Sequence, residues 1–299
     1  MSNGWSWYVI ALVVLNLAGC VWLLWWTGKR RPGDPAPEDT SHYWDGDLTE
    51  YNKPMPRWWL GLFYLSIVFS VGYLVYYPGL GNWVGSSGWT SPREHNVDKA
   101  QNDTRIAATF APYAQVSLPE LARDPAALRL GQAIFANQCA ACHGADARGA
   151  RGFPDLTDAI WHWGGKPEDV LASVADGRQA MMPALASALG GEQGIAETIA
   201  YVQSLSGQKV DAALAAAGAP RFAVCAACHG ADGKGNALLG APDLSDTYWL
   251  YGGDTASIRE TLEKGRSGQM PAHAQALGAA RARVVAAWVY SRSQPQAQP

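Results

Sequence analysis

The sequence predicts a mainly α-helical protein in which a two-helix membrane hairpin precedes two copies of one helical unit. Two uncharged stretches of 20 residues near the N-terminus indicate the hairpin. The string CAACHGADARG at residues 139–149 returns as CAACHGADGKG at residues 225–235, which indicates a duplicated unit. Apolar residues at helical spacing bracket both copies.

The first apolar stretch, residues 7–26, reads WYVIALVVLNLAGCVWLLWW. At about 1.5 Å per residue, a helix of this length crosses a hydrocarbon core about 30 Å thick. Residues 1–6 lack the basic side chains that begin a cleaved signal peptide, whereas basic residues follow the stretch at 29–31. We therefore expect a transmembrane helix that stays in the mature protein.

The second apolar stretch, residues 58–77, begins with two tryptophans and ends with two tyrosines, which suit the two membrane interfaces. Five basic residues lie between the stretches: Lys29, Arg30, Arg31, Lys53 and Arg57. Positive charge favours the cytoplasmic side. The sequence thus predicts a membrane hairpin over residues 1–83 with a cytoplasmic loop at 28–57 and both ends outside.

Residues 84–115 are polar and are expected to form a periplasmic linker that holds a helix ending near Pro112. Beyond residue 85 the chain has 18 Lys and Arg against 20 Asp and Glu. This balance makes nucleic acid an unsuitable partner, because nucleic-acid binding needs a basic surface.

The two repeated units are expected to be domains of about 90 residues, at 116–207 and 208–299. FPDLTDAIWHWGG at 153–165 matches APDLSDTYWLYGG at 241–253, and GRQAMMP at 177–183 matches GRSGQMP at 265–271. These two pairs are offset by 88 residues but the cysteine motifs by 86, so two residues were added between motifs in the second unit.

Helices should open and close each unit. Asp124 is suited to cap the first of them, with Pro125 in the first helical position. AETIAYVQSL closes the first unit and ARVVAAWVYS the second. Gly218 and Pro220 interrupt the corresponding opening helix of the second unit, which we expect to be short or broken.

The Cys-x-x-Cys-His motif is the attachment signature of c-type haem. Two thiols one helical turn apart reach the two vinyl groups of the porphyrin, and the next residue places an imidazole under the iron. We expect two covalently bound haem c groups in two tandem class I cytochrome c domains. The expected residues are Cys139, Cys142 and His143 in the first copy and Cys225, Cys228 and His229 in the second.

Methionine is the expected sixth iron ligand, since a thioether favours ferrous iron and raises the reduction potential. Aligning the two units places Met182 opposite Met270, each directly before a proline. Met181 is an alternative to Met182, and Met270 could instead only pack. With His and Met on both irons, no position stays open, so the haems should transfer electrons without binding oxygen.

Other interpretations of the motif explain less. A zinc site needs more thiols or imidazoles than the outer region offers, and a redox or structural cysteine pair explains neither the repeated histidine nor the paired methionines. Several further residues carry weaker expectations. His162 should make a surface or propionate contact, with a ligand role in the first unit alone as the alternative. Trp161 and Trp249 should pack at a haem edge, donate a propionate hydrogen bond or lie in the core. Cys20 should only pack, and Asn16, Ser66 and Ser70 should contact other helices.

With these motifs in hand, the chain resembles the dihaem subunit, or subunit III, of cbb3-type cytochrome c oxidase. HYWDGDLTEYNKPMPRWW at 42–59 and YYPGLGNW at 76–83 carry the resemblance together with the haem units, and Lys53 departs from the family's usual Asn. The resemblance implies a two-pass protein of the bacterial inner membrane, with its N-terminus and haem domains in the periplasm.

The resemblance also implies a role that is not catalytic by itself. The subunit would take electrons from a soluble or membrane-bound donor cytochrome c and pass them to a monohaem subunit. From there they would reach the haem-copper subunit that reduces oxygen and pumps protons.

Three questions stay open at this point. The chain could instead be a free-standing membrane-anchored dihaem carrier for another periplasmic oxidoreductase. A haem sensor or peroxidase would require an open iron. The tandem units could also exchange ligands, with Met270 serving the iron at His143 and Met182 the iron at His229.

Overall fold

The computed structural model describes residues 1–33, 43–48 and 55–294. They are mainly helical, and the chain divides into two compact units, Met1–Arg105 and Ile106–Pro299. The loop expected at residues 28–57 lies partly outside the described residues.

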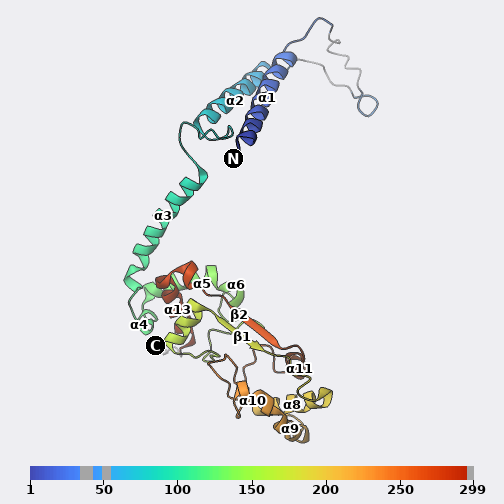
Figure 1. The fold of residues 1–299 in the computed structure, drawn as a ribbon, viewed down its shortest axis with the longest axis vertical. Coiled ribbons are helices and arrows are strands. Elements are labelled where there is room, and N and C mark those ends of the chain that lie inside the picture. The colour runs from blue at the N-terminus through green and yellow to red at the C-terminus, as the bar shows by residue number, and fades with distance from the viewer. Residues whose placement is uncertain (34–42, 49–54, 295–299) are drawn as a thin grey trace. The chain divides into compact units, whose positions relative to one another are not determined.

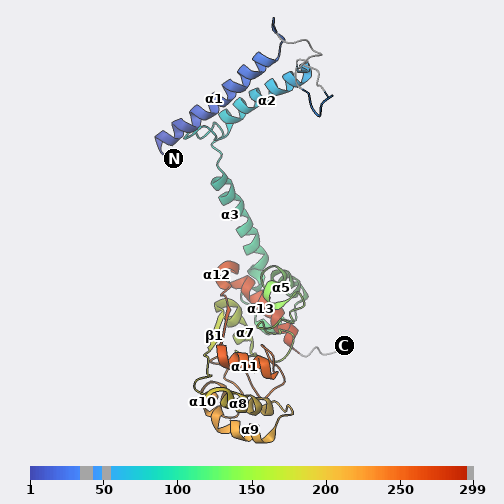
Figure 2. The ribbon, with the colours of Figure 1, turned by 90° about the vertical axis from the view of Figure 1, so that its right-hand side faces the viewer.

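The first unit contains two long helices, α1 (Asn3–Thr27) and α2 (Arg57–Tyr76), which lie side by side and antiparallel (Figures 1 and 2). Their bounds fall within four residues of the expected ones. At one end of the pair Gly28 approaches the Leu60 side chain, and at the other the Asn82 amide donates to Ser6 Oγ at 2.8 Å. Most apolar side chains on these helices are exposed.

By length and composition, three stretches of the described chain could cross a membrane: α1, α2 and Ala212–His229. The third contains the second cysteine motif. After α2, the expected helix ending near Pro112 is confirmed as α3 (Ser91–Phe110), a polar and largely exposed helix that a 3-10 turn, η1 (Ala111–Tyr113), follows.

The long helix of the first repeat begins after Asp124. The Asp124 side chain accepts a hydrogen bond from the Ala126 amide at 2.8 Å, which confirms the predicted cap. Its elements are α4 (Leu118–Leu121), α5 (Pro125–Gln138), α6 (Ala140–His143), α7 (Pro167–Asp176), β1 (Arg178–Met182) and α8 (Gly191–Leu205).

The second repeat opens with a broken helix, as predicted, because Pro220 lies in a 3-10 turn between two short helices. Its elements are α9 (Ala212–Gly218), η2 (Ala219–Phe222), α10 (Ala223–His229), α11 (Thr255–Lys264), β2 (Arg266–Met270), α12 (Ala274–Leu277) and α13 (Ala279–Ser293).

The closing helix of each repeat packs on the opening helix of the other. Helix α13 lies against α4, α5 and α7, while α8 lies against α9, η2 and α11 (Figure 2). Two hydrophobic cores result, one that joins residues 118–174 to 277–289 and one within residues 189–262. We call residues 116–178 with 266–293 the first module and residues 182–265 the second module.

A glycine allows the close helix crossing in the first module. A Cβ on Gly131 would lie 2.6 Å from the Trp288 side chain, so only glycine lets α5 approach α13 this closely. One turn further, the rings of Phe135 and Trp288 lie 4.5 Å apart, and in the second module those of Tyr201 and Phe222 lie 5.2 Å apart. Both crossings thus join residues of different repeats.

An ion pair also ties α8 to the second repeat. Glu197 is 5% exposed, and its carboxylate accepts a hydrogen bond from Arg221 Nε at 2.5 Å. Arg221 Nη1 donates to the Leu189 carbonyl at 2.9 Å. The guanidinium holds the pKa of Glu197 below its usual range, so the pair stays charged at neutral pH.

The chain passes between the modules at a two-stranded antiparallel sheet of β1 and β2. Arg178 pairs with Met270, Ala180 with Gly268 and Met182 with Arg266. This register is symmetric under exchange of the two repeats, since Arg178 corresponds to Arg266 and Met182 to Met270.

We expect Trp288→Ala to lower the free energy of unfolding of the first module by about 3–5 kcal/mol, because it empties a buried aromatic site. Hydrogen exchange followed by mass spectrometry should show lost protection in α5, which belongs to the other repeat, with α9 and α10 unchanged. Leu214→Ala, at a side chain 41% exposed, is the control and should stay within about 0.5 kcal/mol of the parent. Loss confined to the second repeat would contradict the exchanged packing.

Candidate haem sites

Each cysteine motif forms a short helix with one thiol turned inward and one outward. Cys142 and Cys228 are exposed, whereas Cys139 is half-buried and Cys225 is buried. Burial raises the pKa of the Cys139 thiol to about 11 and also raises that of Cys225. All five cysteines of the chain lie among the described residues, and no two of them form a disulfide.

Both motif histidines are buried and held by the same hydrogen bond. His143 Nδ1 lies 3.1 Å from the carbonyl oxygen of Pro154, and His229 Nδ1 lies 3.0 Å from that of Pro242. Because a carbonyl only accepts, the proton is assigned to Nδ1, which leaves the Nε2 lone pair free for a metal. Burial lowers the pKa of both imidazoles, so they are neutral at pH 7.

A tight loop brings each proline carbonyl to its histidine. The Gly149 amide donates to the His143 carbonyl at 2.8 Å, and Gly149 has a φ of +70°. A Cβ here would lie 2.6 Å from the Pro154 carbonyl oxygen, so the position needs glycine for both its angle and its space. The two prolines match between the repeats, but their match alone does not indicate this role.

The structure brings each candidate methionine to the core of the module that holds the other repeat's cysteine motif. Met182 packs on the second core, which contains Cys225, and Met270 packs on the first core, beside Cys139. Met181 is 77% exposed, because successive side chains of a strand point to opposite faces.

The arginine of each repeated Gly-Arg string lies across the sheet from one of these methionines. Arg178 lies opposite Met270 and Arg266 opposite Met182. Each guanidinium covers an aromatic ring, with Arg178 Cζ 5.1 Å from the Trp163 centroid and Arg266 Cζ 4.6 Å from that of Tyr251. In the sequence, the only indication that these arginines belong to the sites is that the Gly-Arg string occurs in both repeats.

The weaker candidates lie elsewhere. His162 is partly buried with its ring 6.0 Å from that of Tyr248, and burial lowers its pKa. Trp161 and Trp249 pack on the first and second cores respectively. Cys20 is partly buried on α1. The polar side chains of α1 and α2 donate to carbonyls of their own helices: Asn16 to Leu12, Ser66 to Phe63 and Ser70 to Ser66.

These residues fit two c-type haems. Each module gathers a pair of thiols, a neutral imidazole with a free nitrogen and a thioether around one apolar core. Within the described part of the chain, no group of three or more His, Cys, Asp or Glu side chains could hold a metal ion. A haem bound between imidazole and thioether supplies reversible one-electron transfer.

Comparison with known proteins agrees with this chemistry. Residues 36–84 match the family model described as the N-terminal domain of cytochrome oxidase-cbb3, FixP. Residues 126–202 and 213–289 each match the model described as cytochrome C oxidase, cbb3-type, subunit III.

Similar proteins match over nearly their whole length. The cbb3-type cytochrome c oxidase subunit CcoP of Rubrivivax gelatinosus is 40% identical over 98% of this chain and 96% of its own. The CcoP subunit of Cereibacter sphaeroides is 38% identical over 88% of this chain and 96% of its own. The FixP subunit of Azorhizobium caulinodans is 39% identical over 87% of this chain and 94% of its own.

Gly149→Ala should reduce haem attachment at the first motif, because the added methyl group strains the loop by about 1–2 kcal/mol and displaces the Pro154 carbonyl. Tryptic peptide mapping of the haem-bearing Cys139 peptide would measure this. Gly207→Ala is the matched control, since Gly207 has a φ of +74° with nothing near its missing Cβ. Equal haem attachment in both variants would show that the loop does not hold the histidine.

Proposed function

Because the chain belongs to the family of cbb3-type cytochrome c oxidase subunits named CcoP or FixP, we propose that it takes electrons from a donor cytochrome c. It then delivers them through the monohaem subunit to the haem-copper subunit that reduces oxygen and pumps protons. The chain is a membrane-anchored dihaem cytochrome c of the oxidase and is not catalytic alone. The duplicated Cys-x-x-Cys-His motif, with its histidine poised for a metal, carries this conclusion.

Two membrane crossings fit the sequence and the packing best. Helices α1 and α2 expose apolar side chains along their length, and the basic loop between them favours the cytoplasm. The third candidate stretch, Ala212–His229, is interrupted at Pro220 and packs on α8, so it belongs to the second module. The N-terminus and residues 84–299 are then periplasmic, with residues 84–115 as the linker.

The iron ligands are exchanged between the repeats in this proposal. Cys139 and Cys142 would hold the first haem, with His143 and Met270 as the residues that bind its iron. Cys225 and Cys228 would hold the second haem, with His229 and Met182 as the residues that bind its iron. Packing supports this assignment, because each thioether packs on the same hydrophobic core as the inner cysteine of that pair, Met270 with Cys139 and Met182 with Cys225.

The protein's residues determine what such haems can do. The Pro154 and Pro242 carbonyls keep the imidazoles in one tautomer and orientation. With methionine as the second iron ligand, neither haem would have a position open to oxygen, and each would supply electron transfer alone. The sheet of β1 and β2 holds both thioether-bearing segments in one element, which would limit their displacement when the oxidation state changes.

A free-standing dihaem carrier would share the haem chemistry but has less support. The N-terminal match at residues 36–84 covers the loop and second helix rather than the haem units, and it ties the membrane part to the same oxidase family. The apolar groove between α1 and α2, lined by residues such as Leu17, Trp22 and Ile67, suits a partner helix.

Replacing the methionines separately tests the ligand exchange. Met182→His should lower the midpoint potential of the haem on Cys225 and Cys228, and Met270→His that of the other haem, since imidazole ligation stabilises ferric iron. Potentiometric titration of chains in which the cysteines of one motif are changed to alanine assigns each shift to the haem on the motif that remains. Met181→His is the control and should leave both potentials unchanged. Shifts in the haem of the same repeat would show unexchanged ligands.

Purification of the tagged chain from its own membranes in mild detergent tests the oxidase assignment. The assembly should contain b-type haem and copper beside two covalent haems per chain, as read from pyridine haemochrome spectra and metal analysis. A dihaem protein that carries neither b-type haem nor copper would favour the free-standing carrier instead.

A further inference from the structure

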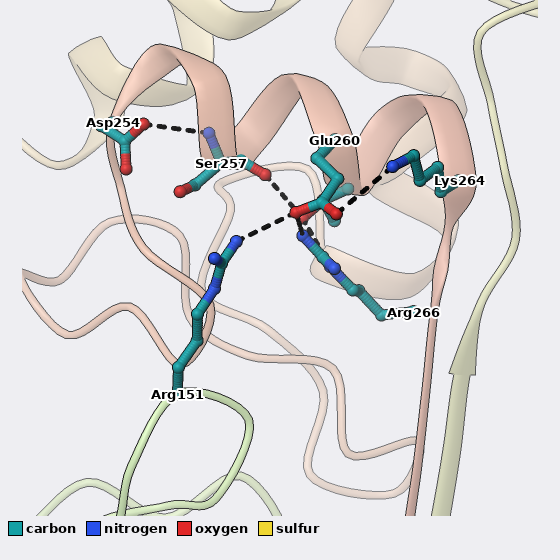
Figure 3. A network of polar contacts seen from close by, with 7 residues as sticks. Arg151, Asp254, Ser257, Glu260, Lys264 and Arg266 are labelled. Atoms are coloured by element: carbon teal, nitrogen blue, oxygen red, sulfur yellow. Dashed lines mark hydrogen bonds and ion pairs between the residues drawn. The ribbon is translucent and has the colours of Figure 1, made fainter.

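One carboxylate joins the two modules through the arginine that lies across the sheet from Met182. Figure 3 shows Glu260 of α11 at the centre of three cationic side chains. Its Oε2 lies 2.8 Å from Arg266 Nη2 and 2.9 Å from Arg151 Nη2, and its Oε1 lies 3.5 Å from Lys264 Nζ. The hydrogen bond from Arg266 is the main reason that the pKa of Glu260 lies below its usual range, so the carboxylate is charged at neutral pH.

The three cations come from different places. Arg266 is the cross-strand neighbour of Met182 and is the most buried of the three, with 19% of its side chain exposed. Arg151 belongs to the loop after the first cysteine motif, where the Gly152 amide donates to the Leu250 carbonyl of the second module at 2.9 Å. Glu260 therefore contacts Arg266 of β2, which lies opposite the proposed ligand Met182, and Arg151 in a loop of the first module.

The first repeat lacks this carboxylate. Helix α7 corresponds to α11 with an offset of 88 residues, so Ala172 stands where the second repeat has Glu260. The arginines are otherwise held alike: Arg178 Nε donates to Ser173 Oγ at 2.9 Å, and Arg266 Nε donates to Thr261 Oγ1 at 3.0 Å.

The remaining contact of the two arginines differs. Arg178 Nη2 donates to the neutral carbonyl of Asp169 at 3.1 Å, whereas Arg266 Nη2 meets the charged Glu260. In the part of the chain that the structure describes, Arg178 makes no ion pair. Among the described residues, the arginine across the sheet from Met182 therefore has a carboxylate partner, whereas the arginine across from Met270 has none.

We propose that Glu260 is a positioning residue that holds Arg266 and the Arg151 loop and sets the reduction potential of the second iron separately from that of the first. This inference rests on the proposed function, specifically on Met182 serving the iron at His229. An anion near a haem stabilises the ferric state, because oxidation adds positive charge to the iron. Partial burial limits the screening of this interaction by water.

Potentiometric titration of the intact chain in its purified complex tests the proposal, with Met182→His used to mark the second haem's component. Glu260→Gln should raise the equilibrium constant for reduction of the second haem about two- to tenfold, the range for one unit charge at partly solvated distances. The first haem should change by a smaller factor. Glu260→Asp, which keeps the charge, should restore a value near that of the parent.

A second pair of variants separates electrostatics from mere loss of structure. Arg151→Gln removes a cation from the same cluster, so it should shift the second haem in the opposite direction and by a smaller factor. Ala172→Glu places a carboxylate at the matching position of the first repeat and should lower the reduction constant of the first haem. Glu192→Gln is the control, because Glu192 also pairs with α11, through Arg259 at 2.6 Å, but is 81% exposed.

Shifts of the same sign in Glu260→Gln and Arg151→Gln, or an unchanged second haem in Glu260→Gln, would overturn the proposal. Failure of the proposed function would give a different titration. The parent chain would then lack two separate haem components, or Met182→His would shift the component of the haem on Cys139 and Cys142.

Discussion

The pairing of β1 with β2 is the constraint on which the two modules of this protein depend. Five residue pairs join the two strands in antiparallel fashion. Each strand leads the chain from the module that contains its own repeat's cysteine motif into the other module. Everything after the crossing is exchanged: α8 completes the core around the second motif, and α13 completes the core around the first. Neither repeat contains all the residues of one folded module.

This arrangement links the two haem sites mechanically. The thioether proposed for each iron and the arginine opposite the other thioether lie on one strand, so a displacement of either strand changes both sites. Close helix crossings at Gly131 and the ion pair of Glu197 with Arg221 hold the exchanged helices in place. A rigid frame suits electron transfer, which proceeds best where nuclei move little between oxidation states.

Near-symmetry also makes the differences between the sites informative. The histidines, their proline carbonyls and the stacked arginines repeat almost unchanged. Glu260 and Arg151 have no charged counterpart in the other copy: Ala172 matches Glu260, and residues 237–240, which match the Arg151 segment, are all uncharged. Duplication gave two similar electron carriers, and a few charged residues where the two modules contact each other distinguish them.

The sequence by itself determined the helical class, the two apolar helices, the duplicated motif and the broken opening helix of the second repeat. These features are local, since they follow from hydropathy over 20 residues, from fixed spacings of Cys and His, and from proline's missing amide hydrogen. Only the tertiary structure decided which core receives Met182 and Met270, that Pro154 and Pro242 hold the histidines, and that Glu260 joins the modules. Strand pairing and helix crossing depend on contacts between residues about 90 positions apart. Two identical repeats satisfy the same sequence pattern whether they fold separately or exchange their ends.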